Sequence, residues 1–129
     1  MTIMRGVVCT GQGQGRSFTQ LDWVRQQFRD KLGFDPYPGT LNLTIESMDA
    51  LAAWRTRQGV VIAPPSPEYC AAKCYRVKVN DRIAAVWIIP QVPGYPANLV
   101  ELMAPVHLRG ALGLKDGDRV QIQLVEGEK

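Results

Sequence analysis

The sequence holds a single histidine, three cysteines and no long hydrophobic run, and each shortage argues against a class of protein. One histidine, His107, disfavours a Ser-His-Asp or Cys-His hydrolase, because both need an imidazole base. Cys9, Cys70 and Cys74 are odd in number and lack the spacing of a disulfide framework or a zinc site. We therefore expect reduced thiols in a cytoplasm. No apolar run approaches the roughly 18 residues of a membrane span, and the first residues lack the layout of a signal peptide.

The sequence also has little excess of charge of either sign. Fifteen basic residues against twelve acidic ones leave a net charge of +3. That balance suits a phosphate-bearing small molecule but is thin for a nucleic-acid interface. The 129 residues fit one compact domain spanning 1–129. Twelve glycines and nine prolines predict many turns and a chain rich in strands.

Hydrophobic periodicity predicts short strands around one substantial helix. The helix is expected over residues 21–32, where apolar residues recur on one face and Gly33 follows as a suitable end. Asn80-Asp81 is expected to form a hairpin turn. Strands are expected at 5–10, 40–45, 60–67, 74–79, 83–89, 99–104 and 120–125, and helical turns at 47–57 and 108–112. The uneven connections favour a small β-barrel with a helical insertion over a βαβ sheet.

Three alternating glycines follow the first expected strand, in a segment that runs from Gly11 to Arg16. Without Cβ atoms, successive backbone N–H groups can curve into a nest for an anion, and the arginine adds a positive charge at its edge. The spacing is neither that of a Walker loop nor that of the dinucleotide fingerprint. A phosphate site and a flexible strand-to-helix turn are therefore both open.

Thr40 and Asn42 stand two residues apart on an expected strand, so their side chains point to the same face. A hydroxyl and an amide carbonyl are hard oxygen donors, suited to a magnesium ion that also takes water and phosphate oxygens. The pair contains no carboxylate, which is unusual for magnesium. The alternative is an ordinary half-solvated strand, in which polar residues alternate with leucines.

Glu101 lies between apolar neighbours on another expected strand. It is either a surface residue or an inward acid whose pKa rises by desolvation, which would suit a general base. Arg109 is a candidate to bind phosphate or to pair with this carboxylate. Tyr95, in the loop before the strand, is the aromatic side chain best placed to lie over a planar ligand, although a plain loop residue fits the pattern too. The turn at 115–118 is interpreted as structural.

Taken together, these segments resemble the archaeal-type CTP-dependent riboflavin kinases. The matching strings occur in the family's order and cover nearly the whole chain. They are GQGQGRSF at 11–18, LGFDPYPGTLNL at 32–43, IIP at 88–90, ELMAPVHLR at 101–109 and LKDGD at 114–118. The string Pro-Tyr-x-Gly-Thr-Leu-Asn is specific, whereas the glycine loop and the Gly-Asp turn are not.

The resemblance implies a six-stranded cradle-loop (RIFT-type) barrel and transfer of the γ-phosphate of CTP to the 5′-hydroxyl of riboflavin, giving FMN and CDP. It implies Mg²⁺ as the cofactor, with Thr40 and Asn42 as its ligands, and Glu101 at the flavin's ribityl chain. The nucleotide would be held by Gly11, Gln12, Gly13, Gln14, Gly15 and Arg16, and by Val106, His107, Leu108 and Arg109.

Two segments depart from the family's pattern. Pro93 stands near the place where the family usually has a threonine that touches the flavin, so that contact is expected either to be lost or to move to Tyr95. The segment 47–67 also matches poorly. Two other functions remain open beside the kinase. One is a non-catalytic nucleotide- or flavin-binding module of the same fold, and the other is a small DNA-binding barrel. The expected partners are CTP and riboflavin, with neither nucleic acid nor membrane.

Overall fold

A computed structural model describes residues 3–11 and 19–125. Within them the helices are α2 (Asp22–Gln27), continued by the π-helical turn η1 (Phe28–Leu32), then α3 (Met48–Arg55) and α4 (Leu108–Leu112). The strands are β1 (Ile3–Cys9), β2 (Leu41–Ile45), β3 (Val60–Ile62), β4 (Ala72–Val79), β5 (Ile83–Pro90), β6 (Leu99–Met103) and β7 (Arg119–Leu124). Among these residues, no helix is both long and apolar enough to span a membrane.

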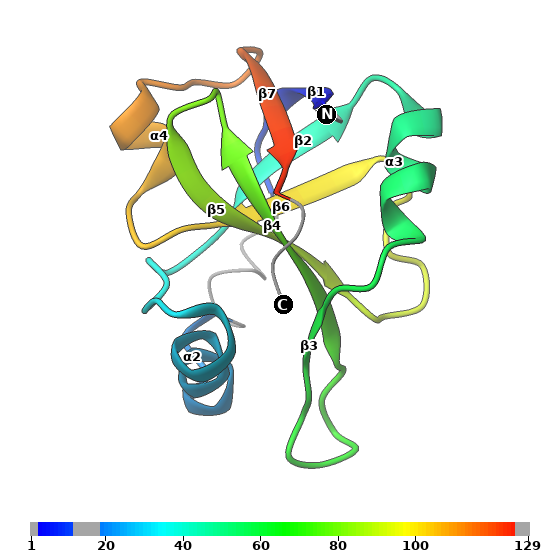
Figure 1. Cartoon of the computed structure of the whole chain (residues 1–129), viewed down its shortest axis with the longest axis vertical. Coiled ribbons are helices and arrows are strands. Elements are labelled where there is room, and N and C mark those ends of the chain that lie inside the picture. Colours follow the sequence, from blue (N-terminus) through cyan, green and yellow to red (C-terminus); the bar gives the residue numbers. More distant parts are fainter. Residues whose placement is uncertain (1–2, 12–18, 126–129) are drawn as a thin grey trace.

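The sheet closes because β4 reaches three partners. It pairs along its full length with β5, while its Val77–Val79 end pairs with β7 and its Ala72–Cys74 end with β3. The order β4-β5-β6-β2-β1-β7 then returns to β4, and every pairing is antiparallel. The described residues therefore form a closed six-stranded barrel with β3 added at one edge, and α2, α3 and α4 lie at separate places around it (Figure 1). The predicted fold class, mainly β with one substantial helix and short helical turns, is confirmed.

The sequence of β5 is an almost continuous hydrophobic run because its two faces contribute to two different apolar clusters. Trp87 and Ile89 face the barrel interior, where Trp54 of α3 packs against Trp87 with ring centroids 5.9 Å apart. The alternate residues Val86 and Ile88 face outward and are covered by α2 and η1. A strand buried on both faces has no need of polar alternation.

The predicted local signals are confirmed at the helix and at the hairpin. The helical segment runs for eleven residues from Asp22 to Leu32, and Gly33 ends it at φ +84°. Asn80 and Asp81 have φ of +49° and +56°, the two positive values that a tight hairpin turn between β4 and β5 requires. The strand predicted over 60–67 is shorter and stops at Ile62. Prolines follow it at 64, 65 and 67, and proline cannot donate a ladder hydrogen bond.

Candidate active site

Glu101 lies on the outer face of the barrel, and three other predicted site residues contact it or pair with it: Thr40, Asn42 and Tyr95. Its position on β6 is opposite Asn42 of β2, and side chains at paired positions share a face. The neighbouring residues of both strands point into the core, which turns Glu101 and Asn42 outward. Of the two alternatives that the sequence left open, a surface residue and an inward acid, the first holds in part. The carboxylate points away from the barrel interior, but it is half-buried.

Both carboxylate oxygens of Glu101 accept a hydrogen bond from a hydroxyl. Thr40 Oγ1 donates to Oε1 at 2.8 Å, and the Tyr95 hydroxyl donates a short hydrogen bond to Oε2. Burial is the main cause that raises the pKa of Tyr95, and the adjacent carboxylate raises it further. The phenol therefore stays protonated and remains a donor across the physiological pH range. Two fixed donors hold the carboxylate in one orientation.

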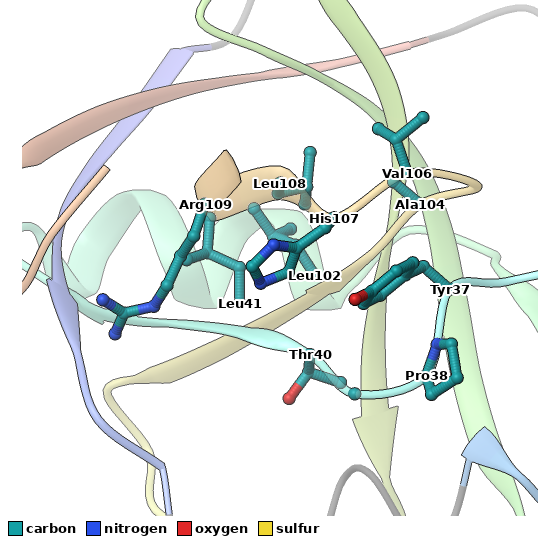
Figure 2. A pocket seen from close by; sticks show the side chains of 11 residues that line it. Tyr37, Pro38, Thr40, Leu41, Leu102, Ala104, Val106, His107, Leu108 and Arg109 are labelled. Carbon is teal, nitrogen blue, oxygen red and sulfur yellow. The ribbon is translucent and has the colours of Figure 1, made fainter. Parts of the chain in front are cut away.

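A cavity of about 180 Å³ opens beside Thr40, between the segment before β2 and the start of α4 (Figure 2). Tyr37 and His107 form part of its wall as a stacked pair, with ring centroids 5.0 Å apart and an interplanar angle of 29°. The predicted nucleotide residues Val106, His107, Leu108 and Arg109 all line this cavity. The structure thus brings the predicted 106–109 segment next to the predicted metal ligand Thr40. Sequence analysis did not single out Tyr37, although it lies within the specific family string.

The Arg109 side chain leaves α4 and reaches the end of β1. Its Nη2 donates to the Cys9 carbonyl at 3.3 Å and forms a close ion pair with Asp116. Thr10 Oγ1 donates a short hydrogen bond to the other oxygen of Asp116. These two contacts lower the pKa of Asp116, so it is ionised at neutral pH. The sequence pattern predicts only a structural turn at 115–118, so nothing in it marks Asp116 as a residue of the site.

Gly11, the first residue of the glycine segment, lies against the side chain of Asn42. A Cβ added to it would come 2.3 Å from Asn42 Nδ2, so only glycine fits without a shift. This close approach places the start of the glycine segment directly at the predicted metal pair. The predicted nucleotide residues Gln12, Gly13, Gln14, Gly15 and Arg16 lie outside the described residues.

A second hollow, of about 420 Å³, lies on the Tyr95 side of Glu101. Arg55 and Lys73 line it together with the end of β5 and the loop that carries Pro93 and Tyr95. Glu101 lines neither recess itself, but one of its hydrogen-bond donors, Thr40, lines the first recess and the other, Tyr95, lines the second. Sequence analysis did not single out Arg55 or Lys73, which lie in or near the segment that matches the family poorly.

Thr40 and Asn42 supply a donor set that fits a divalent cation together with phosphate oxygens. Thr40 gives its hydroxyl proton to Glu101, which leaves the lone pairs of that oxygen free for a cation. Among the described residues no three His, Cys, Asp or Glu side chains cluster to form a metal site by themselves. A cation held here would need ligands from a second molecule, as Mg²⁺ commonly does in phosphate sites.

Comparison with known proteins places the chain in a family. Residues 8–124 match the model of the CTP-dependent riboflavin kinase family, which is described as "Domain of unknown function DUF120". The chain is 46% identical over 125 residues to a riboflavin kinase of Methanocella arvoryzae, covering 95% of this chain and 56% of that protein. It is 41% identical over 127 residues to a riboflavin kinase of Archaeoglobus fulgidus, covering 95% of this chain and 54% of that protein.

A riboflavin kinase of Ignicoccus hospitalis is 34% identical over 124 residues, covering 92% of this chain and 69% of that protein. The chain spans about half the length of the first two relatives. The family match nonetheless covers almost all of the barrel, including Thr40, Asn42, Glu101 and Arg109. By this match, the chain belongs to the CTP-dependent riboflavin kinase family.

Proposed function

We propose that residues 1–129 form one riboflavin kinase domain, which transfers the γ-phosphate of CTP to the 5′-hydroxyl of riboflavin and yields FMN and CDP. One observation carries the proposal beyond the family match. The carboxylate of Glu101 is hydrogen-bonded to one lining residue of each of two recesses, and a phosphoryl transfer needs a place for the donor and a place for the acceptor. Three free cysteines accord with a cytoplasmic setting for this reaction.

The nucleotide is assigned to the Thr40 side of Glu101. There the cavity beside Tyr37 and His107 continues to Arg109, which donates to the carbonyl of Cys9, two residues before the glycine segment begins. Residues 11–16 would hold the phosphates, and residues 106–109 would contact the nucleoside. Thr40 and Asn42 would hold Mg²⁺, which when bound neutralises charge on the phosphates.

Riboflavin is assigned to the Tyr95 side of Glu101. The recess is lined by Pro93, which has neither a hydroxyl nor an N–H to offer, and by Arg55 and Lys73, which have several donors. Polar contacts with the flavin would therefore come from the other polar side chains of the recess, which include these two cations and the amide of Gln91. The ribityl chain would extend from this recess past Glu101 toward the phosphates.

Phosphoryl transfer requires the protein mainly to position the two substrates and to stabilise charge, without forming a covalent bond to either. The ribityl 5′-oxygen attacks the γ-phosphorus, a new P–O bond forms, and the bond to the β–γ bridging oxygen breaks so that CDP leaves. Glu101 accepts the proton of the attacking hydroxyl. Its carboxylate has about four lone-pair positions, and the bonds from Thr40 and Tyr95 occupy two of them. Their fixed direction orients the remaining positions.

The first experiment is to incubate the purified chain with riboflavin, Mg²⁺ and CTP, ATP, GTP or UTP in separate reactions, and to measure FMN by chromatography. The proposal expects FMN with CTP and little with the others. Thr40→Val should abolish turnover, and Thr44→Val is the matched control because Thr44 is an exposed threonine of β2, four residues further along the chain. Absence of FMN with every nucleotide would refute the kinase. Retained nucleotide binding in that case would favour a binding module.

A further inference from the structure

Asp116 joins the two chain segments that are assigned to the nucleotide. One of its carboxylate oxygens accepts from Thr10, directly before the glycine segment, and the other pairs with Arg109 of α4. Arg109 also donates to the carbonyl of Cys9 in β1. A third segment of the chain thus ties the guanidinium to the base of the glycine segment, although Thr10 and Asp116 are 106 residues apart in sequence.

The turn that carries Asp116 is itself held firmly. Its Gly117 N–H donates to the Val8 carbonyl at 2.9 Å, and the Val8 N–H donates to the Asp118 carbonyl at 2.8 Å. The Asp118 carboxylate accepts from the Lys115 N–H at 2.9 Å and closes the turn. Gly117 adopts φ +94°, which favours glycine. The Asp116 side chain therefore projects from a backbone fixed to β1, and it is not a freely moving surface carboxylate.

We propose that Asp116 is a positioning residue for the nucleotide: it holds Arg109 against the end of β1, so that the guanidinium is already in place to meet the phosphates. The proposal rests on the proposed nucleotide site. An unpaired arginine would sample many rotamers and lose conformational entropy on binding. Ordering it in advance lowers the cost of binding a phosphate chain.

The proposal can be tested because positioning and simple charge repulsion predict opposite changes in nucleotide affinity when Asp116 loses its charge. Asp116 carries a negative charge close to the assigned phosphate site, so removing that charge should strengthen anion binding if nothing else changes. If the carboxylate positions Arg109, removing its charge should instead weaken nucleotide binding. The direction of the change distinguishes the two effects.

The test compares Asp116→Asn with Asp118→Asn in the full chain. Both substitutions remove one negative charge from the same turn, but Asp118 contacts Lys115 and neither Arg109 nor Thr10. For Asp116→Asn we expect the KM for CTP and the Kd for CDP to rise roughly five- to tenfold, with the KM for riboflavin unchanged. For Asp118→Asn we expect an equal or lower Kd for CDP. Thermal unfolding of both variants shows whether folding is affected.

A second pair of variants approaches the same contact from the other side. Thr10→Val removes the hydroxyl that donates to Asp116, whereas Thr10→Ser keeps it. We expect Thr10→Val to weaken CDP binding and Thr10→Ser to restore it. Unchanged or tighter CDP binding by Asp116→Asn would overturn the proposal while leaving the kinase intact. Failure of the unaltered chain to bind CDP would instead overturn the nucleotide assignment on which the proposal rests.

Discussion

The role of Glu101 can be tested with a substitution that leaves the shape of the site unchanged. Glutamine in its place keeps the size of the side chain and one oxygen acceptor. It puts an NH₂ group opposite one of the two hydroxyls, so either Thr40 or Tyr95 must turn its hydroxyl to accept. Exchanging a hydrogen bond to a charged group for a neutral one costs about 1–2 kcal/mol. Glu101→Gln should therefore fold, with a modestly lower free energy of unfolding.

The catalytic effect should be much larger than the effect on stability. Glutamine cannot accept a proton, and general-base catalysis contributes typically about 10²- to 10⁴-fold to a rate. We expect the kcat of Glu101→Gln to fall by at least about 10²-fold, with the Kd for riboflavin changed by less than about tenfold. The measurements are steady-state FMN formation and riboflavin binding by fluorescence.

Two comparisons make the result decisive. Glu46→Gln removes a glutamate charge from the surface, where the Glu46 carboxylate forms an ion pair with Arg119 away from the site, so it should leave kcat unaltered. Tyr95→Phe removes one of the two donors that orient Glu101 but leaves the base in place, so kcat should fall by about three- to tenfold. A kcat for Glu101→Gln within about threefold of the unaltered chain would refute the base role and leave Glu101 as a hydrogen-bond acceptor.

Three further predictions concern packing, one at the site and two in the core. Gly11→Ala places a Cβ against the end of the Asn42 side chain and forces that side chain to turn from its present position, so the KM for CTP and the Mg²⁺ requirement should rise several-fold; unchanged values would contradict the role of Asn42. Burial raises the pKa of Cys74 to about 12, so a thiol reagent at pH 8 should modify the exposed Cys70 and spare Cys74 until the chain unfolds. Leu43→Ala in the barrel interior should lower the free energy of unfolding by about 2–5 kcal/mol in denaturant titrations; a loss below about 1 kcal/mol would mean that the cavity collapses.

The local elements could be predicted from the sequence because their causes are local. The helix over 22–32 follows from one apolar face and from Gly33 at its end. The hairpin at Asn80 and Asp81 follows from two residues that tolerate positive φ. The closure of the barrel has no such local signal. Closure depends on the pairing of β4 with β7, which lies more than 40 residues later in the chain. The sequence of each strand predicts only a half-buried strand and does not indicate its partner.

The candidate site was predictable only in part, for the same reason. The motif that carries Thr40 and Asn42 identifies candidates, but not the hydrogen bond between Thr40 and a carboxylate 61 residues away. The role of Asp116 could not be predicted, because its contacts with Thr10 and Arg109 form only when the 115–118 turn packs against β1 in the folded chain. Residue type alone cannot distinguish a turn aspartate that serves its own backbone from one that serves a distant arginine.

Strand register decides whether the site exists at all. Asn42 faces Glu101, while Leu43 faces Val100, so the polar pair points outward and the apolar pair fills the barrel. A slip of one residue would turn Glu101 toward the interior and expose a core residue. Burying an unpaired carboxylate costs several kcal/mol, so such a register is strongly disfavoured. The same alternation that stabilises the barrel therefore places Glu101 beside Asn42, and a rearrangement that separated them would also expose the core.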